Sequence, residues 1–148
     1  MSRYMETDIL IIGAGIAGSA LACALSKSEL EVIVLERSAL PLDTARGDHL
    51  QPRSCEILKS WGVLDKFFTA GAEKRGKTIW RNQHDTIFFD SCYDELNIAE
   101  PYFAYLNHEL IGQILLNSAS ESDNTQLIKP CPQWSIVEKK TSSVEVKA

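Results

Sequence analysis

The sequence carries little positive charge, and its basic residues form no long cluster. Lysine and arginine together number 15 against 20 aspartates and glutamates, so the 148 residues have a net charge of -5. The densest basic groups are short and interrupted: Lys74, Arg75 and Lys77, and then Lys139 and Lys140. Because binding to a nucleic-acid backbone requires a continuous basic surface, we expect no nucleic-acid partner.

Paired cysteines and clustered histidines are also absent. Four widely spaced cysteines, with no Cys-x-x-Cys pair, and three scattered histidines do not match the spacing of a tetrahedral metal site. We therefore predict no metal site, and a reducing, cytoplasmic environment. No Ser-His-Asp, Cys-His or paired-carboxylate arrangement is recognisable either, so the sequence identifies no catalytic residue.

No apolar run is long enough to cross a membrane. The most apolar stretch, "DILIIGAGIAGSALACALS" from Asp8 to Ser26, is interrupted by three glycines, whereas a spanning helix needs about 18 unbroken apolar residues. Glu6 and Asp8 precede it, where a secretory signal would carry positive charge. We predict neither an integral membrane segment nor a signal peptide.

The same stretch changes its hydrophobic period. Residues 9–12 form a continuous apolar run, which predicts a strand buried on both faces, and Val32 to Leu35 form a second run of this kind. Between them the spacing is helical from residue 16, and the predicted apolar face consists of Ala17, Ala20, Leu21, Ala24 and Leu25. Strand, helix and strand over about 30 residues predict a βαβ unit with parallel strands.

The glycines of "GAGIAG" have separate roles in this unit. Gly13 is expected to allow the tight turn out of the strand, Gly15 to let the backbone approach a pyrophosphate, and Gly18 to let helix and strand pack closely. The free amides of the first helical turn, including those of Ile16 and Ala17, are expected to face the anion.

Glu36 ends the second strand and strengthens this interpretation. A carboxylate at that place accepts hydrogen bonds from both hydroxyls of an adenosine ribose and repels a 2′-phosphate, which disfavours NADP at this site. NAD and FAD both remain compatible with the motif. A βαβ unit whose glycines serve packing alone is the non-functional alternative.

The residues after Glu36 resemble a known family. Glu36-Arg37 is followed by "RGDHLQP" at 46–52, "EIL" at 56–58 and "GVLD" at 62–65. This pattern is similar to that of the FAD-dependent monooxygenases of the aromatic-hydroxylase group, which are p-hydroxybenzoate hydroxylase-like and related to squalene epoxidases. The resemblance covers nearly the whole chain. It implies an α/β fold in which a Rossmann-like βαβ FAD-binding domain with a parallel sheet is followed by the start of a small antiparallel sheet.

The resemblance also implies roles for three residues. The arginines matching Arg37 and Arg46 contact the adenine end and the pyrophosphate or flavin side of FAD. The position of Asn107 usually holds an arginine or glutamine that reaches the phosphates. Asparagine is shorter and uncharged, and Asn107 also suits the N-cap of a helix, so capping alone is a sufficient explanation.

Further elements follow from local patterns. A helix is predicted from Pro52, capped by Gly62, with a short second helix after it. Two strands are predicted within residues 77–90 around an Asn-Gln-His-Asp turn. We interpret residues 77–100 as the start of the substrate-domain sheet, and we favour a buried core position for three aromatic residues in this segment, Trp80, Phe88 and Phe89.

The last third of the chain predicts one helix and three strands. The helix follows Asn107, with Glu109 in its first turn and an apolar stripe of Leu110, Ile111, Ile114 and Leu115. A third parallel strand is predicted at 125–128, and a hairpin at 133–138 and 143–147.

Taken together, residues 1–148 are expected to be the N-terminal FAD-binding part of a monooxygenase that uses NAD(P)H and O2 to hydroxylate or epoxidise a small organic substrate. Related enzymes continue to an Asp-Gly and a Gly-Asp motif beyond this length, so we expect the isolated chain to be a portion of the family fold and inactive. Two alternatives remain: an NAD-dependent or other Rossmann oxidoreductase, and a truncated, inactive remnant.

Overall fold

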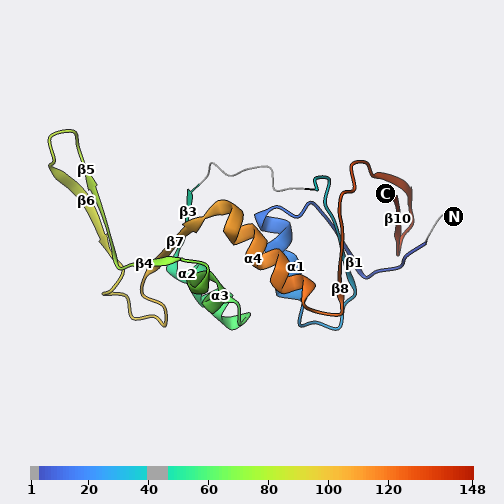
Figure 1. The fold of residues 1–148 in the computed structure, drawn as a ribbon, viewed down its shortest axis with the longest axis horizontal. Coiled ribbons are helices and arrows are strands. Elements are labelled where there is room, and N and C mark those ends of the chain that lie inside the picture. The colour runs from blue at the N-terminus through green and yellow to red at the C-terminus, as the bar shows by residue number, and fades with distance from the viewer. Residues whose placement is uncertain (1–3, 40–46) are drawn as a thin grey trace. The chain divides into compact units, whose positions relative to one another are not determined.

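We describe the fold from a computed structural model of the chain, which describes residues 4–39 and 47–148. The chain divides into two compact units (Figure 1). The first unit comprises residues 1–42 and 115–148, and the second comprises residues 43–114.

The first unit is built on a parallel sheet. Strand β1 (Ile9–Ile12), helix α1 (Ile16–Leu25) and strand β2 (Val32–Leu35) form the βαβ unit, and β8 (Thr125–Ile128) pairs with the other edge of β2. The sheet order is β1-β2-β8, with all pairings parallel. All four residues of the central strand β2 are buried. The predicted strand, helix and strand order and the third parallel strand are confirmed.

Two burial predictions in this unit were wrong. Strand β1 is not buried on both faces, because Ile12 is 42% exposed. The buried residues of α1 are Ser19, Ala22 and Cys23, while Leu21, on the predicted apolar face, is 48% exposed. The side chains that α1 buries are small, and the helix lies close to β1, because a Cβ on Gly18 would already lie 3.3 Å from Cγ2 of Ile11. Close packing against the strand therefore determines which face of the helix is buried, and the predicted apolar face does not.

A single asparagine holds the connection between α1 and β2. The Asn124 side-chain amide lies 3.2, 3.0 and 2.9 Å from the carbonyl oxygens of Leu25, Ser28 and Leu30, to which it donates. Its backbone carbonyl accepts from the Val32 N–H at 2.8 Å. After β8, strands β9 (Ser135–Lys139) and β10 (Val144–Lys147) form the predicted antiparallel hairpin.

The second unit contains an antiparallel sheet that local patterns did not predict. Strands β3 (Gly47–Leu50), β7 (Phe103–Asn107) and β4 (Glu73–Arg75) pair in the order β3-β7-β4. Residues 47–50 of the motif at 46–52, for which the sequence predicted no strand, form β3. Pairing with the distant strand β7 determines this conformation, and it cannot be inferred from β3 alone.

Helices α2 (Pro52–Ser60) and α3 (Leu64–Thr69) follow as predicted and end in the same way. After α2, the N–H of Gly62 donates to the Lys59 carbonyl at 2.9 Å, and the N–H of Val63 donates to the Leu58 carbonyl at 3.0 Å. Gly62 has φ +76°, which glycine adopts without steric cost. Gly71, with φ +98°, ends α3 by the same pair of bonds. The predicted glycine cap of α2 is confirmed.

Helix α4 (His108–Ser120) follows β7, and the boundary between the two units lies within it. The Oδ1 atom of Asn107 accepts a hydrogen bond from the Glu109 N–H at 2.9 Å, which confirms the predicted N-cap. Of the predicted apolar stripe, Ile111 and Leu115 are buried, while Leu110 is 36% exposed.

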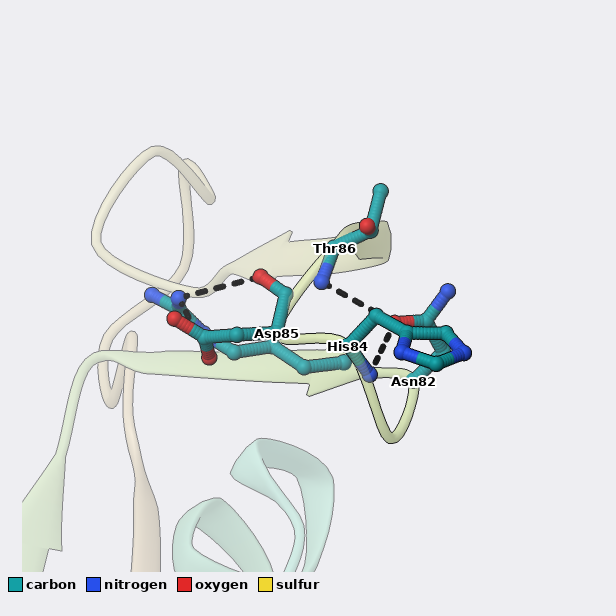
Figure 2. A network of polar contacts seen from close by, with 5 residues as sticks. Asn82, His84, Asp85 and Thr86 are labelled. Carbon is teal, nitrogen blue, oxygen red and sulfur yellow. Dashed lines mark hydrogen bonds and ion pairs between the residues drawn. The ribbon is translucent and has the colours of Figure 1, made fainter.

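The remaining strands of the second unit, β5 (Lys77–Arg81) and β6 (Ile87–Cys92), form the predicted two-stranded hairpin, which extends away from α2 and α3 in Figure 1. Its turn is held by Asn82, whose Oδ1 accepts from the N–H groups of His84 and Thr86 at 2.9 and 3.0 Å (Figure 2). Arg81 also pairs with Asp85 at 3.0 Å.

The aromatic residues of this hairpin are not core residues. Trp80 is 40% exposed, Phe88 67% and Phe89 54%, so the expected core position was wrong. Trp80 and Phe89 pack on each other across the strands with ring centroids 4.9 Å apart. In the part of the chain that the structure describes, β5 and β6 pair only with each other, so no third strand extends this hairpin into a larger sheet. Within that same part, no helix is long and apolar enough to cross a membrane.

Candidate functional site

The candidate site begins at the turn between β1 and α1. Gly13 has φ +99°, a conformation that L side chains rarely adopt, and its N–H donates to the Leu35 carbonyl at 2.7 Å. The chain can therefore leave β1 and enter α1 within three residues. The role predicted for Gly13 in making a tight turn agrees with this geometry.

The other two glycines of the motif differ in their surroundings. A Cβ placed on Gly18 would lie 1.9 Å from the carbonyl oxygen of Gly13, so no larger residue fits without a backbone shift. A Cβ placed on Gly15 would meet nothing within 4 Å. Gly18 is thus required by packing, whereas Gly15 leaves open space beside its backbone, which is the property that close approach of a ligand needs.

The start of α1 offers backbone donors without acceptors. Gly15 is the N-cap residue and provides no side-chain hydrogen bond, and the first turn contains no acidic residue. Among the described residues, none accepts a hydrogen bond from the N–H groups of Ile16, Ala17 or Gly18. With the helix dipole, these amides give the turn a partial positive charge that suits a phosphate.

Glu36 points toward this turn. One carboxylate oxygen accepts from the Ala14 N–H at 2.7 Å, and the other accepts from the Ser38 N–H at 2.8 Å. Both bonds fix the carboxylate at the carboxyl end of β2, beside the glycine turn. Each oxygen keeps a further lone pair for a ligand hydroxyl, as the sequence-based role of Glu36 requires.

A hollow of about 250 Å³ lies at this place in the first unit. It is lined by Ile12, Gly13, Leu35, Glu36, Arg37, Cys131 and Trp134. Three of the predicted site residues, Gly13, Glu36 and Arg37, therefore border one space. Arg37 is exposed and forms no hydrogen bond or ion pair with another described residue.

Sequence reasoning missed four residues of this lining: Ile12, Leu35, Cys131 and Trp134. The position of two of them in the sequence could have indicated this role, because ligands of open parallel sheets bind outside the carboxyl ends of the strands. Cys131 and Trp134 follow the carboxyl end of β8, as Gly13 follows β1 and Glu36 follows β2. Neighbouring parallel strands bring these three chain segments to one edge.

Two predicted site residues lie elsewhere. Arg46 lies outside the described residues. Asn107 belongs to the second unit, where its side chain caps α4, so a role in cofactor binding stays a prediction.

The second unit has its own polar cluster around the buried Glu100. Its carboxylate accepts from the Tyr102 hydroxyl at 2.5 Å and pairs with the Lys59 ammonium. Lys74 lies over the rings of Phe68 and Tyr102, 4.7 and 4.3 Å from their centroids. The hydrogen bonds from Lys59 and Tyr102 hold the pKa of Glu100 below its usual value, while burial and the Glu100 contact raise the pKa of Tyr102. The cluster joins α2 to the segment before β7, and we treat it as structural.

The cysteines and acidic residues indicate neither a reactive thiol nor a metal site among the described residues. None of the four cysteines, Cys23, Cys55, Cys92 and Cys131, is in a disulfide. Burial raises the pKa of Cys55, which makes its thiol a poor nucleophile. Over residues 4–39 and 47–148, no three His, Cys, Asp or Glu side chains come close enough to hold a metal ion.

A parallel βαβ unit with a glycine turn, open helix amides and a terminal acidic residue defines a dinucleotide-binding protein of the α/β class. Comparison with protein families gives the family: residues 6–137 match the FAD-binding domain family, to which the chain belongs. Its residues fit that cofactor, since the open space at Gly15, the unpaired first-turn amides and the Glu36 carboxylate supply what a diphosphate and its ribose require.

Individual relatives agree with this assignment. The chain is 35% identical over 97 residues to a squalene epoxidase of Schizosaccharomyces pombe, covering 66% of this chain and 19% of the relative. It is 29% identical over 125 residues to the 6-hydroxy-3-succinoylpyridine 3-monooxygenase of Pseudomonas putida, covering 83% and 32%. Among solved structures, the anhydrotetracycline hydroxylase OxyS of Streptomyces rimosus has a TM-score of 0.75 at 22% identity, covering 95% of this chain and 27% of that one.

The chain thus spans about a fifth to a third of the length of these proteins. It corresponds to the FAD-binding domain of flavin monooxygenases, and both the predicted fold class and the resemblance are confirmed.

Proposed function

We propose that this chain is the FAD-binding part of a monooxygenase that uses NAD(P)H and O2 to hydroxylate or epoxidise a small organic substrate. The bound FAD supplies the transfer of electrons from NAD(P)H to oxygen. The protein binds and orients the cofactor. By their names, the related proteins act on squalene, 6-hydroxy-3-succinoylpyridine and anhydrotetracycline, so we propose an apolar or aromatic substrate without choosing among these.

One observation carries the proposal: the Glu36 carboxylate and the glycine turn border the same hollow in a chain of this family. In the proposed complex the N–H groups of Ile16, Ala17 and Gly18 donate to the pyrophosphate. The Glu36 carboxylate accepts from the ribose hydroxyls, while Arg37 lies at the adenine end. Arg46 and Asn107 are proposed to contact the phosphate or flavin side.

We further propose that the hairpin β5–β6 begins the substrate-domain sheet. Its five large apolar side chains, Ile79, Trp80, Ile87, Phe88 and Phe89, are all at least 40% exposed, which is unusual for a two-stranded ribbon without a covering layer. Further strands of a longer enzyme would cover this surface. We propose the cytoplasm as its location, in keeping with four widely spaced cysteines that form no disulfide.

Titration of the purified 148-residue chain with FAD tests the proposal. Thermal unfolding and flavin fluorescence are followed together, with NAD as the comparison ligand. At a hundred times its dissociation constant, FAD should stabilise the native state by about 2.7 kcal/mol. The variant Glu36→Ala should lower the affinity for FAD, because the ribose loses its acceptor.

Each alternative function gives a different result. Stabilisation by NAD without any effect of FAD would favour a nicotinamide-dependent oxidoreductase. A folded chain that responds to neither ligand would favour an inactive remnant, in which the glycines serve packing alone.

A further inference from the structure

One aromatic residue lies among those that line the hollow. Trp134 lines it and is 46% exposed, which leaves a large apolar ring surface open to the space that Gly13 and Glu36 also border. The indole ring is in no aromatic or cation–π contact with another described residue. A half-exposed indole ring that lines a hollow beside a dinucleotide turn offers an apolar face on which a planar ligand ring can stack.

The backbone fixes the segment that carries Trp134. The Glu36 N–H donates to the Ile128 carbonyl at 3.0 Å, and the Glu36 carbonyl accepts from the Cys131 N–H at 2.7 Å. Cys131 is itself buried in a cluster with Ile33 and Leu35. The chain after β8 is thus bound on both sides to the residue that is proposed to hold the ribose, and Trp134 follows three residues later.

We propose that Trp134 is the stacking surface for the adenine ring of the dinucleotide. This inference rests on the proposed function, in which Glu36 holds the adenosine ribose. A base is joined to its ribose by one bond, so a ribose at Glu36 places the base in the same hollow. Purine rings stack on indole rings, and the Arg37 guanidinium on the same lining can add a second planar contact.

Measuring the affinity for FAD, which contains adenosine, and for FMN, which does not, tests this role. Trp134→Ala should weaken FAD binding by about tenfold to a hundredfold, which is the usual effect of removing one base-stacking ring. Trp134→Phe should recover most of the affinity. FMN lacks the adenosine, so its affinity should be equal in wild type and Trp134→Ala. Dissociation constants come from flavin fluorescence and calorimetry, without any assay of activity.

Trp80→Ala is the matched control. Trp80 is also an exposed tryptophan, at 40%, but it lies on the hairpin β5–β6, so its removal should leave FAD affinity unchanged. If Trp134→Ala does not fold, Trp134→Phe compared with Trp134→Leu provides the same contrast between aromatic and aliphatic side chains.

The outcomes separate this inference from the proposed function. Wild type that binds FAD, with Trp134→Ala binding it equally well, would overturn the stacking role alone. An equal loss of FAD and FMN affinity in Trp134→Ala would also overturn it, because the effect would not depend on adenine. Wild type that binds no FAD would overturn both.

Discussion

Strands β2 and β6 are both rich in large apolar residues, yet their surroundings are opposite. All four side chains of β2 are buried, whereas Ile87, Phe88 and Phe89 at the start of β6 are 49–67% exposed. Strand β2 has β1 and β8 on its two edges, while β6 pairs with β5 alone over residues 4–39 and 47–148. An apolar run therefore predicts a strand in both regions, but its burial depends on neighbours that the run does not specify.

The largest effect should come from breaking the packing of α1 against β1 and the glycine turn. Gly18→Ala places a Cβ 1.9 Å from the Gly13 carbonyl oxygen, so the glycine turn must shift. We expect a loss of about 3 kcal/mol in the free energy of unfolding and a loss of FAD binding, measured by urea denaturation and fluorescence titration.

Gly15→Ala is the control for this change, since its Cβ meets open space. It should leave unfolding within about 0.5 kcal/mol of wild type while weakening FAD binding. Equal destabilisation by both variants would contradict the division of roles between the two glycines.

A direct test compares one residue from each strand. Val34 is fully buried in β2, so Val34→Ala should cost about 2 kcal/mol through lost burial and the cavity it leaves. Phe88→Ser removes a larger side chain that is 67% exposed and should change the free energy of unfolding by less than about 0.5 kcal/mol. A greater cost for Phe88→Ser would mean that the hairpin is packed in solution.

The second unit should show a pH dependence that comes from Glu100. Its pKa is lowered, so its contribution to stability is present above the unfolded pKa of about 4.3 and is lost as the pH falls through the folded value. Glu100→Gln should cost about 1–2 kcal/mol at pH 7. It should also flatten the fall in the urea midpoint that occurs as the pH drops below about 5.

Glu73→Gln provides the comparison, because Glu73 forms an exposed ion pair with Arg75. Glu73→Gln should leave both the urea midpoint at pH 7 and the fall of that midpoint at acid pH almost unchanged. An acid slope that persists in Glu100→Gln would assign the pH dependence to other carboxylates.

The smallest effect should be local to the hairpin. Asn82→Ala removes an acceptor from the N–H groups of His84 and Thr86 (Figure 2) and should lower the local opening free energy by about 1 kcal/mol. Hydrogen exchange of the β5–β6 amides should accelerate, while that of β2 stays constant. Faster exchange in β2 as well would show that the two regions unfold together.

Much of the candidate site could be predicted because it depends on neighbouring residues. The glycine turn, the helix that follows it and the place of Glu36 at the end of β2 all fall within one βαβ unit. Trp134 was missed because nearly a hundred residues separate it from Glu36. Only the parallel pairing of β2 with β8 brings the two together.

By itself, the sequence determined the strand, glycine turn and helix at the start of the chain, the caps at Gly62 and Asn107, and the two hairpins, since each rests on backbone preferences within a few residues. The tertiary structure decided which face of α1 is buried, the β3-β7-β4 sheet, the exposure of the hairpin aromatics and the presence of Trp134 at the hollow. These features depend on partners far away in the chain, and local pattern carries no information about distant pairing.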